Sequence, residues 1–137
     1  MSSVESHVET QNAQSRVQWQ KVGTRPLLLI DLSHATDHAE TLAAVAYARR
    51  LVPMHAPIKI LTMTDVTGIR YNAQVVQAIR EMADHNKPYV AWGAVIGLSA
   101  LLRTIYELAH RASGRTNLQT FDTREAGLAW LARVAET

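Results

Sequence analysis

The stretch that decides the fold is PLLLID at residues 26–31, in which a run of four apolar residues ends at an aspartate. A continuous apolar run of this kind, bounded by a proline and a polar residue, is typical of a strand buried on both faces of a parallel sheet. The stretch ILTMTD at residues 60–65 has the same character and also ends at an aspartate. The two stretches predict parallel strands whose carboxyl ends carry Asp31 and Asp65.

Helical patterns separate these strands from each other and from two further ones. Asp37 and Asp122 each begin a D-x-x-E pattern, which is typical of a helix N-terminus. The expected strands cover residues 27–30, 58–64, 89–95 and 118–121, and the expected helices cover 37–51, 72–85, 97–112 and a last segment that begins near Asp122.

This alternation predicts an α/β fold with a mostly parallel, four-stranded sheet flanked by helices. Right-handed crossovers leave few topologies open. We expect the strand at 27–30 to be central because it is so apolar, which gives the strand order 2-1-3-4. In the helix at 97–112 we expect an inward-facing set made up of Leu98, Leu101, Leu102, Ile105 and Leu108.

The first part of the chain differs from the rest in composition. Residues 1–24 are rich in Ser, Gln and Glu, and we expect them to be a flexible lead-in to a single domain at 25–137. The alternation of apolar and polar residues at 17–20 also fits an extra N-terminal edge strand. The two interpretations stay open at this point.

The composition bounds the class of protein. With 137 residues, 47% of them hydrophobic, the chain is long enough for one domain with a substantial core. Its 14 Lys and Arg nearly balance its 12 Asp and Glu, and they form no basic stripe, so we expect no nucleic-acid partner. The absence of cysteine excludes thiol chemistry. We expect neither a transmembrane segment nor a signal peptide, and hence a cytoplasmic location.

A ligand site is expected at the carboxyl ends of the strands, where open parallel sheets bind their ligands. The turns after the strands converge there, and an apolar rim from the third strand completes the candidate crevice. Asp65 and Thr67 would either point into this crevice or hydrogen-bond their own backbone, with Gly68 serving only the turn. The candidate ligand-binding residues are Asp31, Ser33, Asp65, Thr67, Gly68, Trp92 and Gly97.

The sequence contains no motif that specifies a catalytic or metal site. His34 and His38 are four residues apart, but no third ligand follows at a telling distance, so we expect two solvated histidines and no metal. The glycines of GAVIGLS at 93–99 match neither a dinucleotide fingerprint nor a P-loop, and no serine lies in a G-x-S-x-G elbow. We therefore expect no cofactor and no enzyme. An enzyme would have to use the two histidines with Asp31 and Asp65.

Four segments together resemble a known family, the small bacterial STAS-like proteins, which are SpoIIAA-like and related to CRAL-TRIO domains. The resemblance covers about residues 26–132 and implies a SpoIIAA-like fold. The segments are LLLIDLSHAT at 27–36, ILTMTDVTGIRYN at 60–72, ADHNKPYVAWGAVIGLSALLRTIY at 83–106 and SGRTNLQTFDTREAGLAWL at 113–131.

The resemblance implies a non-enzymatic regulatory or protein-interaction module with an unknown protein partner, and a homodimer fits this class. Some STAS domains are switched by phosphorylation of a serine at a helix start. The corresponding segment here, residues 37–40, has no hydroxyl at that place, and Ser33, Thr36 and Thr41 do not match the motif. The alternative hypothesis is a binding protein for a small apolar or amphipathic ligand at the carboxyl ends of the strands.

Overall fold

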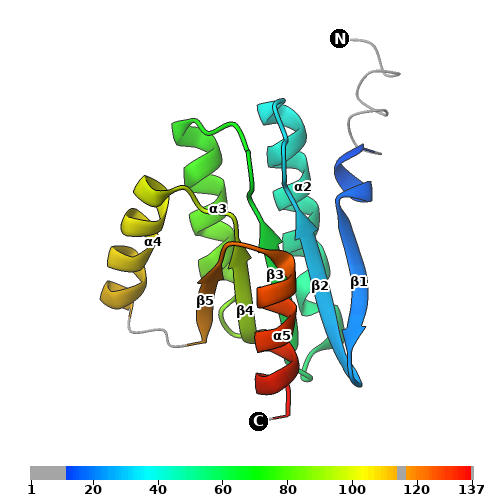
Figure 1. Cartoon of the computed structure of the whole chain (residues 1–137). Helices are drawn as coiled ribbons and strands as arrows, with labels where there is room; N and C mark the ends of the chain where they lie inside the picture. The colour runs from blue at the N-terminus through cyan, green and yellow to red at the C-terminus, as the bar shows by residue number, and fades with distance from the viewer. Residues whose placement is uncertain (1–11, 114–116, 137) are drawn as a thin grey trace.

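The computed structural model describes residues 12–113 and 117–136 and shows a sheet with helices on both faces (Figure 1). A helical turn at residues 12–15 precedes the first strand. The elements, in chain order, are β1 (Val17–Val22), β2 (Arg25–Asp31), α2 (His38–Leu51), the short 3-10 helix η1 (Val52–His55), β3 (Ile60–Asp65), α3 (Ala73–Asn86), β4 (Val90–Ile96), α4 (Ala100–Ser113), β5 (Leu118–Phe121) and α5 (Arg124–Val134).

The expected strands and helices are all present, and the extra N-terminal edge strand is confirmed as β1. β1 pairs with β2 in antiparallel orientation, while the pairs β2–β3, β3–β4 and β4–β5 are all parallel. The structure therefore confirms an α/β fold with a mostly parallel sheet flanked by helices. Residues 1–11 of the expected lead-in lie outside the described residues.

The predicted strand order is wrong, because the strands follow one another across the sheet in the sequential order β1-β2-β3-β4-β5. The middle of the sheet is β3, all six residues of which are buried. β2 is nevertheless an interior strand, since β1 covers the edge that the predicted order had assigned to a parallel neighbour. The apolar run at residues 27–30 is therefore buried beside an antiparallel neighbour, the extra edge strand β1, which had no position in the predicted order 2-1-3-4.

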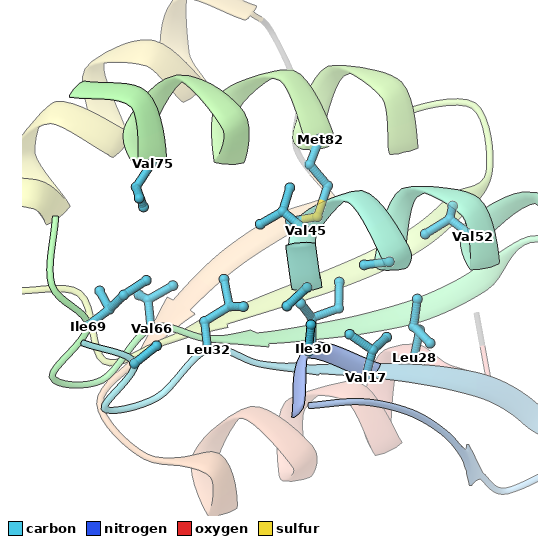
Figure 2. Packing of buried hydrophobic residues seen from close by; sticks show 14 of the residues in the cluster. Val17, Leu28, Ile30, Leu32, Val45, Val52, Val66, Ile69, Val75 and Met82 are labelled. Atoms are coloured by element: carbon cyan, nitrogen blue, oxygen red, sulfur yellow. The ribbon is translucent and has the colours of Figure 1, made fainter. Parts of the chain in front are cut away.

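One face of the sheet is covered by α2 and α3. Side chains alternate along a strand, so β2 directs Leu28 and Ile30 to this face and Leu27 to the other. Figure 2 shows the helix side chains of this core packed over the strands, with α5 on the opposite side of the sheet. The labelled members of this cluster are Val17, Leu28, Ile30, Leu32, Val45, Val52, Val66, Ile69, Val75 and Met82.

The opposite face is covered by α5, which brings Leu131 onto Leu61 and Met63 of β3. The aromatic side chains of this face gather around Trp130 of α5. The Trp130 ring lies 5.8 Å from the Trp92 ring and 5.5 Å from the Phe121 ring, measured between centroids. The chain thus builds two cores, one on each side of the sheet.

The start of α5 differs from the prediction by one residue. The N-cap is Thr123, whose hydroxyl accepts from the Ala126 amide at 3.2 Å, and Asp122 instead forms an ion pair with Arg103. The other predicted cap is confirmed, because Asp37 caps α2 and accepts from the Ala39 amide at 3.0 Å. The displaced cap makes Arg124 the first residue of α5.

The predicted inner face of α4 is wrong for two of its leucines. Leu101 and Leu108 are 72% and 61% exposed, whereas Leu102 and Tyr106 face the body of the protein. α4 carries apolar residues on two adjacent stripes, so hydrophobic spacing alone could not select the inner one. The Ile105 side chain lies outside the described part of the structure. In the ranges that the structure describes, no helix has the length and apolar character needed to cross a bilayer.

Truncation of Leu28 tests the larger core. The Leu28 side chain is fully buried between β2 and the helices, so Leu28→Ala should lower the free energy of unfolding by about 2–5 kcal/mol through lost burial and a residual cavity. Leu101→Ala, at the exposed side of α4, should change it by less than about 0.5 kcal/mol. Urea unfolding followed by circular dichroism measures both, and equal effects would contradict the assignment of these faces.

Candidate functional site

An arginine at the first position of α5 joins the carboxyl ends of two strands. Arg124 Nη2 lies 2.8 Å from Asp31 Oδ1 at the end of β2, and Arg124 Nε lies 2.6 Å from Asp65 Oδ2 at the end of β3. The two aspartates are direct partners in the parallel ladder. The side chains of Arg124 and Asp31 are 38% and 33% exposed, and that of Asp65 only 6%. We call these three residues the Arg124 cluster.

Each aspartate of the cluster also accepts hydrogen bonds from the residue two positions further along its own turn. Asp31 Oδ1 accepts hydrogen bonds from the Ser33 amide at 3.0 Å and from the Ser33 hydroxyl at 2.5 Å. Asp65 Oδ1 accepts from the Thr67 amide at 3.0 Å and from the Thr67 hydroxyl at 2.7 Å. Of the two interpretations left open by the sequence, local hydrogen bonding is the one that these side chains adopt.

The charges of the cluster stabilise one another. Burial raises the pKa of Asp31, but hydrogen bonds from Ser33 and Arg124 outweigh it and hold the pKa below its ordinary value of 3.8. Burial lowers the pKa of Arg124, and the hydrogen bonds to Asp65 and Asp31 outweigh that effect in turn. An Asp31 carboxylate that stays ionised to low pH is a poor proton donor or acceptor near neutrality.

Two glycines let the turns at this edge fit together. Gly68 has a φ of +65°, and a side-chain carbon there would lie only 2.6 Å from His34 Nδ1. Gly97 has a φ of +80°, and a side-chain carbon there would collide with the Thr67 hydroxyl. Both positions therefore exclude L side chains for conformational and steric reasons. The turns interlock where the sequence analysis expected a crevice.

The structure brings six of the seven candidate residues to this edge and places the seventh elsewhere. Trp92 pairs in register with Leu61, well before the carboxyl ends of β3 and β4, and its ring faces Trp130 on α5. The residues at the edge are Asp31, Ser33, Asp65, Thr67, Gly68 and Gly97.

The two aspartates and two histidines that were considered for catalysis each contact other residues. The two aspartates are paired with Arg124, and His34 packs against Gly68. His38 Nδ1 lies 2.9 Å from Asn72 Nδ2, on the residue that caps α3. Within residues 12–113 and 117–136, no three His, Asp or Glu side chains are grouped so that they could hold a metal ion. The edge has the geometry of a closed structural corner.

A second candidate site lies on the other side of the sheet from α5. A cavity of about 240 Å³ lies between α3, α4 and the strands, and we call it the α3–α4 pocket. It extends along the sheet face and is separate from the Arg124 cluster. Its floor and walls include Thr62, Gly93, Leu118, Val76, Ile79 and Leu102.

A few polar groups interrupt the apolar lining of this pocket. The Tyr71 hydroxyl is buried and has no hydrogen-bond partner in the described part of the chain, and burial raises the pKa of Tyr71 to about 12. Thr62 and Thr64 of β3 are buried and face the same space. A side-chain carbon at Gly93 would lie 2.8 Å from the Thr62 hydroxyl, so the glycine leaves room beside that group.

Neither Arg124 nor this pocket was predicted from the sequence, although the sequence contains a signal for each. Arg124 begins a helix, where the macrodipole disfavours a cation unless a specific anionic partner compensates. Thr62 and Thr64 alternate with Leu61 and Met63 in a buried strand, which places two hydroxyls on one face of the sheet. Residues that break a local rule in this way often mark a functional or strained site.

Removal of the arginine tests the Arg124 cluster. Arg124→Met leaves the buried Asp65 carboxylate without its cation, so we expect the free energy of unfolding to fall by about 1–3 kcal/mol. Arg133→Met, at an exposed position of the same helix, should change it by less than about 0.5 kcal/mol. Chemical unfolding of both variants measures the difference. A double-mutant cycle with Asp65→Asn should show coupling, and simple additivity would contradict the contact.

Lowering the pH tests the ionised state of Asp31. Its pKa is lower in the folded chain than the ordinary value of 3.8, so its stabilising contribution is complete above that value and is lost as the pH falls through the folded pKa. Asp31→Asn should therefore destabilise the protein near pH 7 and progressively less as the pH falls below 3.8. Urea unfolding over a series of pH values compares variant and wild type, and a pH-independent difference would rule out this role.

Comparison with protein-family models, with curated proteins and with solved structures finds no match for this chain. The STAS-like family assignment therefore stays a prediction. What is established is the α/β architecture with its sequential five-stranded sheet. Function has to be inferred from the geometry of the Arg124 cluster and the α3–α4 pocket.

Proposed function

We propose that this protein binds a small amphipathic ligand in the α3–α4 pocket and carries out no covalent chemistry on it. The observation that carries the proposal is a cavity of about 240 Å³ whose lining is largely apolar, with a few polar groups facing into it. Small-molecule sites in proteins combine these two properties, since the apolar wall supplies affinity and the polar groups fix orientation. The Arg124 cluster, in contrast, has its hydrogen-bonding groups engaged with one another.

The size of the cavity limits the ligand. An engineered apolar cavity of about 150 Å³ is large enough for benzene, so a cavity of about 240 Å³ suits a molecule with roughly ten non-hydrogen atoms. Such a ligand would bind with a Kd of roughly 1 mM or lower at ordinary efficiency per atom. The proposal thus keeps the ligand class expected from the sequence but moves its site from the carboxyl ends of the strands to the helix-covered face.

The polar groups suggest how the ligand would lie. Tyr71 adds no charge to the lining, because its ordinary pKa of 10 is already above physiological pH and burial raises the pKa further, to about 12. The Thr62 hydroxyl faces the floor of the cavity beside Gly93. A polar atom of the ligand that reaches the Thr62 hydroxyl could form a hydrogen bond with it, and this bond would fix the orientation of the ligand.

Filling the cavity tests the proposal. Ala83 of α3 lines the pocket, so the side chain of Ala83→Phe would occupy the space of the ligand. We expect octanamide, a neutral amphiphile of suitable size, to bind the wild type in isothermal titration and to lose at least about tenfold in affinity for this variant. Ala129→Phe places the same ring at an exposed position of α5, on the opposite face of the sheet, and should leave binding unchanged.

Two further measurements keep this test decisive. Circular dichroism establishes that Ala83→Phe still folds, since overpacking can destabilise a core. Native mass spectrometry of the wild type, purified under mild conditions, reports any ligand that is carried along. If octanamide binds the folded filled variant as tightly as the wild type, the pocket is not the binding site.

The non-enzymatic regulatory or protein-interaction module is our second proposal, and it is supported by the STAS-like resemblance. The exposed Leu101 and Leu108 lie seven residues apart and thus on the same side of α4, a spacing found in helices that contact a partner. This surface lies on the helix whose other side lines the pocket. The two proposals are compatible, because a ligand bound under α4 would support the surface above it.

A further inference from the structure

The α3–α4 pocket has one charged residue in its otherwise uncharged lining. Arg80 of α3 contributes to the wall, and among the described residues that form the pocket it is the only Asp, Glu, His, Lys or Arg. Arg80 is an exposed residue, so its guanidinium group can be in contact with solvent while the residue still lines one side of the cavity. The cavity therefore has positive charge on one side, at Arg80, and uncharged walls elsewhere.

Among the described residues, no carboxylate forms an ion pair with Arg80. In the part of the chain that the structure describes, the ion pairs involve Arg16, Arg103 and Arg124, and Arg80 takes part in none of them. Asp84 lies one helical turn further along α3 and does not pair with Arg80. Arg80 thus differs from these three ion-paired arginines, and its guanidinium donors are available to a ligand.

We propose that the ligand of the α3–α4 pocket is a small monocarboxylate, whose apolar body fills the cavity and whose carboxylate is bound by Arg80; this inference rests on the proposed function. A guanidinium group matches a carboxylate in shape and can donate two parallel hydrogen bonds to it. The carboxylate end remains hydrated at the boundary, so the anion does not have to be transferred into the apolar interior.

The inner part of the pocket supports a ligand with one charged end. Val76, Ile79 and Leu102 supply apolar contacts, and the hydroxyls of Tyr71 and Thr62 are neutral. The cavity therefore contains no second cation among the residues described, and a dicarboxylate would leave one anionic end without a partner. A phosphate monoester, with its larger charge, would likewise be neutralised only in part by Arg80.

The charge preference can be measured with two probes of nearly equal shape. Octanoate and octanamide both have about ten non-hydrogen atoms, which suits the cavity, and they differ in charge. Isothermal titration should show that wild-type protein binds octanoate roughly fivefold more tightly than octanamide, as an exposed ion pair allows. Raising the salt concentration should reduce this preference without weakening the binding of octanamide.

Three variants assign the preference to Arg80. Arg80→Gln should bring the ratio of the octanoate and octanamide affinities, both measured in that variant, from about five down to about one. Arg80→Lys keeps the charge and should retain part of the preference. Arg133→Gln removes an exposed arginine from α5, on the other face of the sheet, and should bind both probes as the wild type does.

Each outcome of these titrations decides one question. Equal affinity of the wild type for the two probes would overturn the monocarboxylate inference and leave the pocket as a site for neutral ligands. A preference for octanoate that survives in Arg80→Gln would overturn the role of Arg80. Binding of neither probe would overturn the proposed function and the inference together.

Discussion

Right-handed crossover connections constrain almost everything else in this structure. In a parallel sheet whose strands follow in sequential order, each right-handed connection places its helix on the same face. The helices α2 and α3 therefore pack side by side on one face, and α4 joins them there to enclose the pocket. The opposite face needs a cover from elsewhere, and α5 provides it after the last strand.

The same constraint explains where the two candidate sites lie. After β5 the chain has to cross to the other face of the sheet, where α5 packs. Arg124, the first residue of α5, forms ion pairs with Asp31 at the end of β2 and Asp65 at the end of β3, and these pairs fix the start of the helix. α4 has 14 residues but is connected to β5, a strand of only 4 residues. A helix of that length extends roughly 21 Å, well beyond a strand of roughly 13 Å. The pocket lies between α3 and α4 over the part of the sheet formed by β3, β4 and β5.

The sequence predicted the secondary structure well and the strand order poorly, for a physical reason. Apolar runs, helix caps and periodicity are local, so the four parallel strands and their helices could be read from short windows. Strand order depends on which edges pair over long distances, and PLLLID is equally well buried with β1 or with a parallel strand beside it. β3 is the central strand, but its two threonines make it less apolar than the run at residues 27–30, so its sequence did not indicate this position.

The site at the carboxyl ends of β2 and β3 was also predicted only as far as local sequence patterns allow. The meeting of Asp31, Ser33, Asp65 and Thr67 could be predicted, because parallel strands end at the same edge. Their common partner could not, since Arg124 is 59 residues away from Asp65 along the chain. The inner stripe of α4 was ambiguous for another reason: Leu101 and Leu102 are equally apolar, and only the tertiary structure distinguishes them.

The late position of α5 in the chain has a consequence for biosynthesis. The face of the sheet that bears Leu27, Leu61 and Met63 is built from strands that leave the ribosome before α5 does. Until residues 124–134 emerge, the apolar side chains of this face have no helix to cover them. Docking of α5 then buries this surface and brings Arg124 to Asp31 and Asp65 in the same step, so the second core closes only after all of its strands have been made.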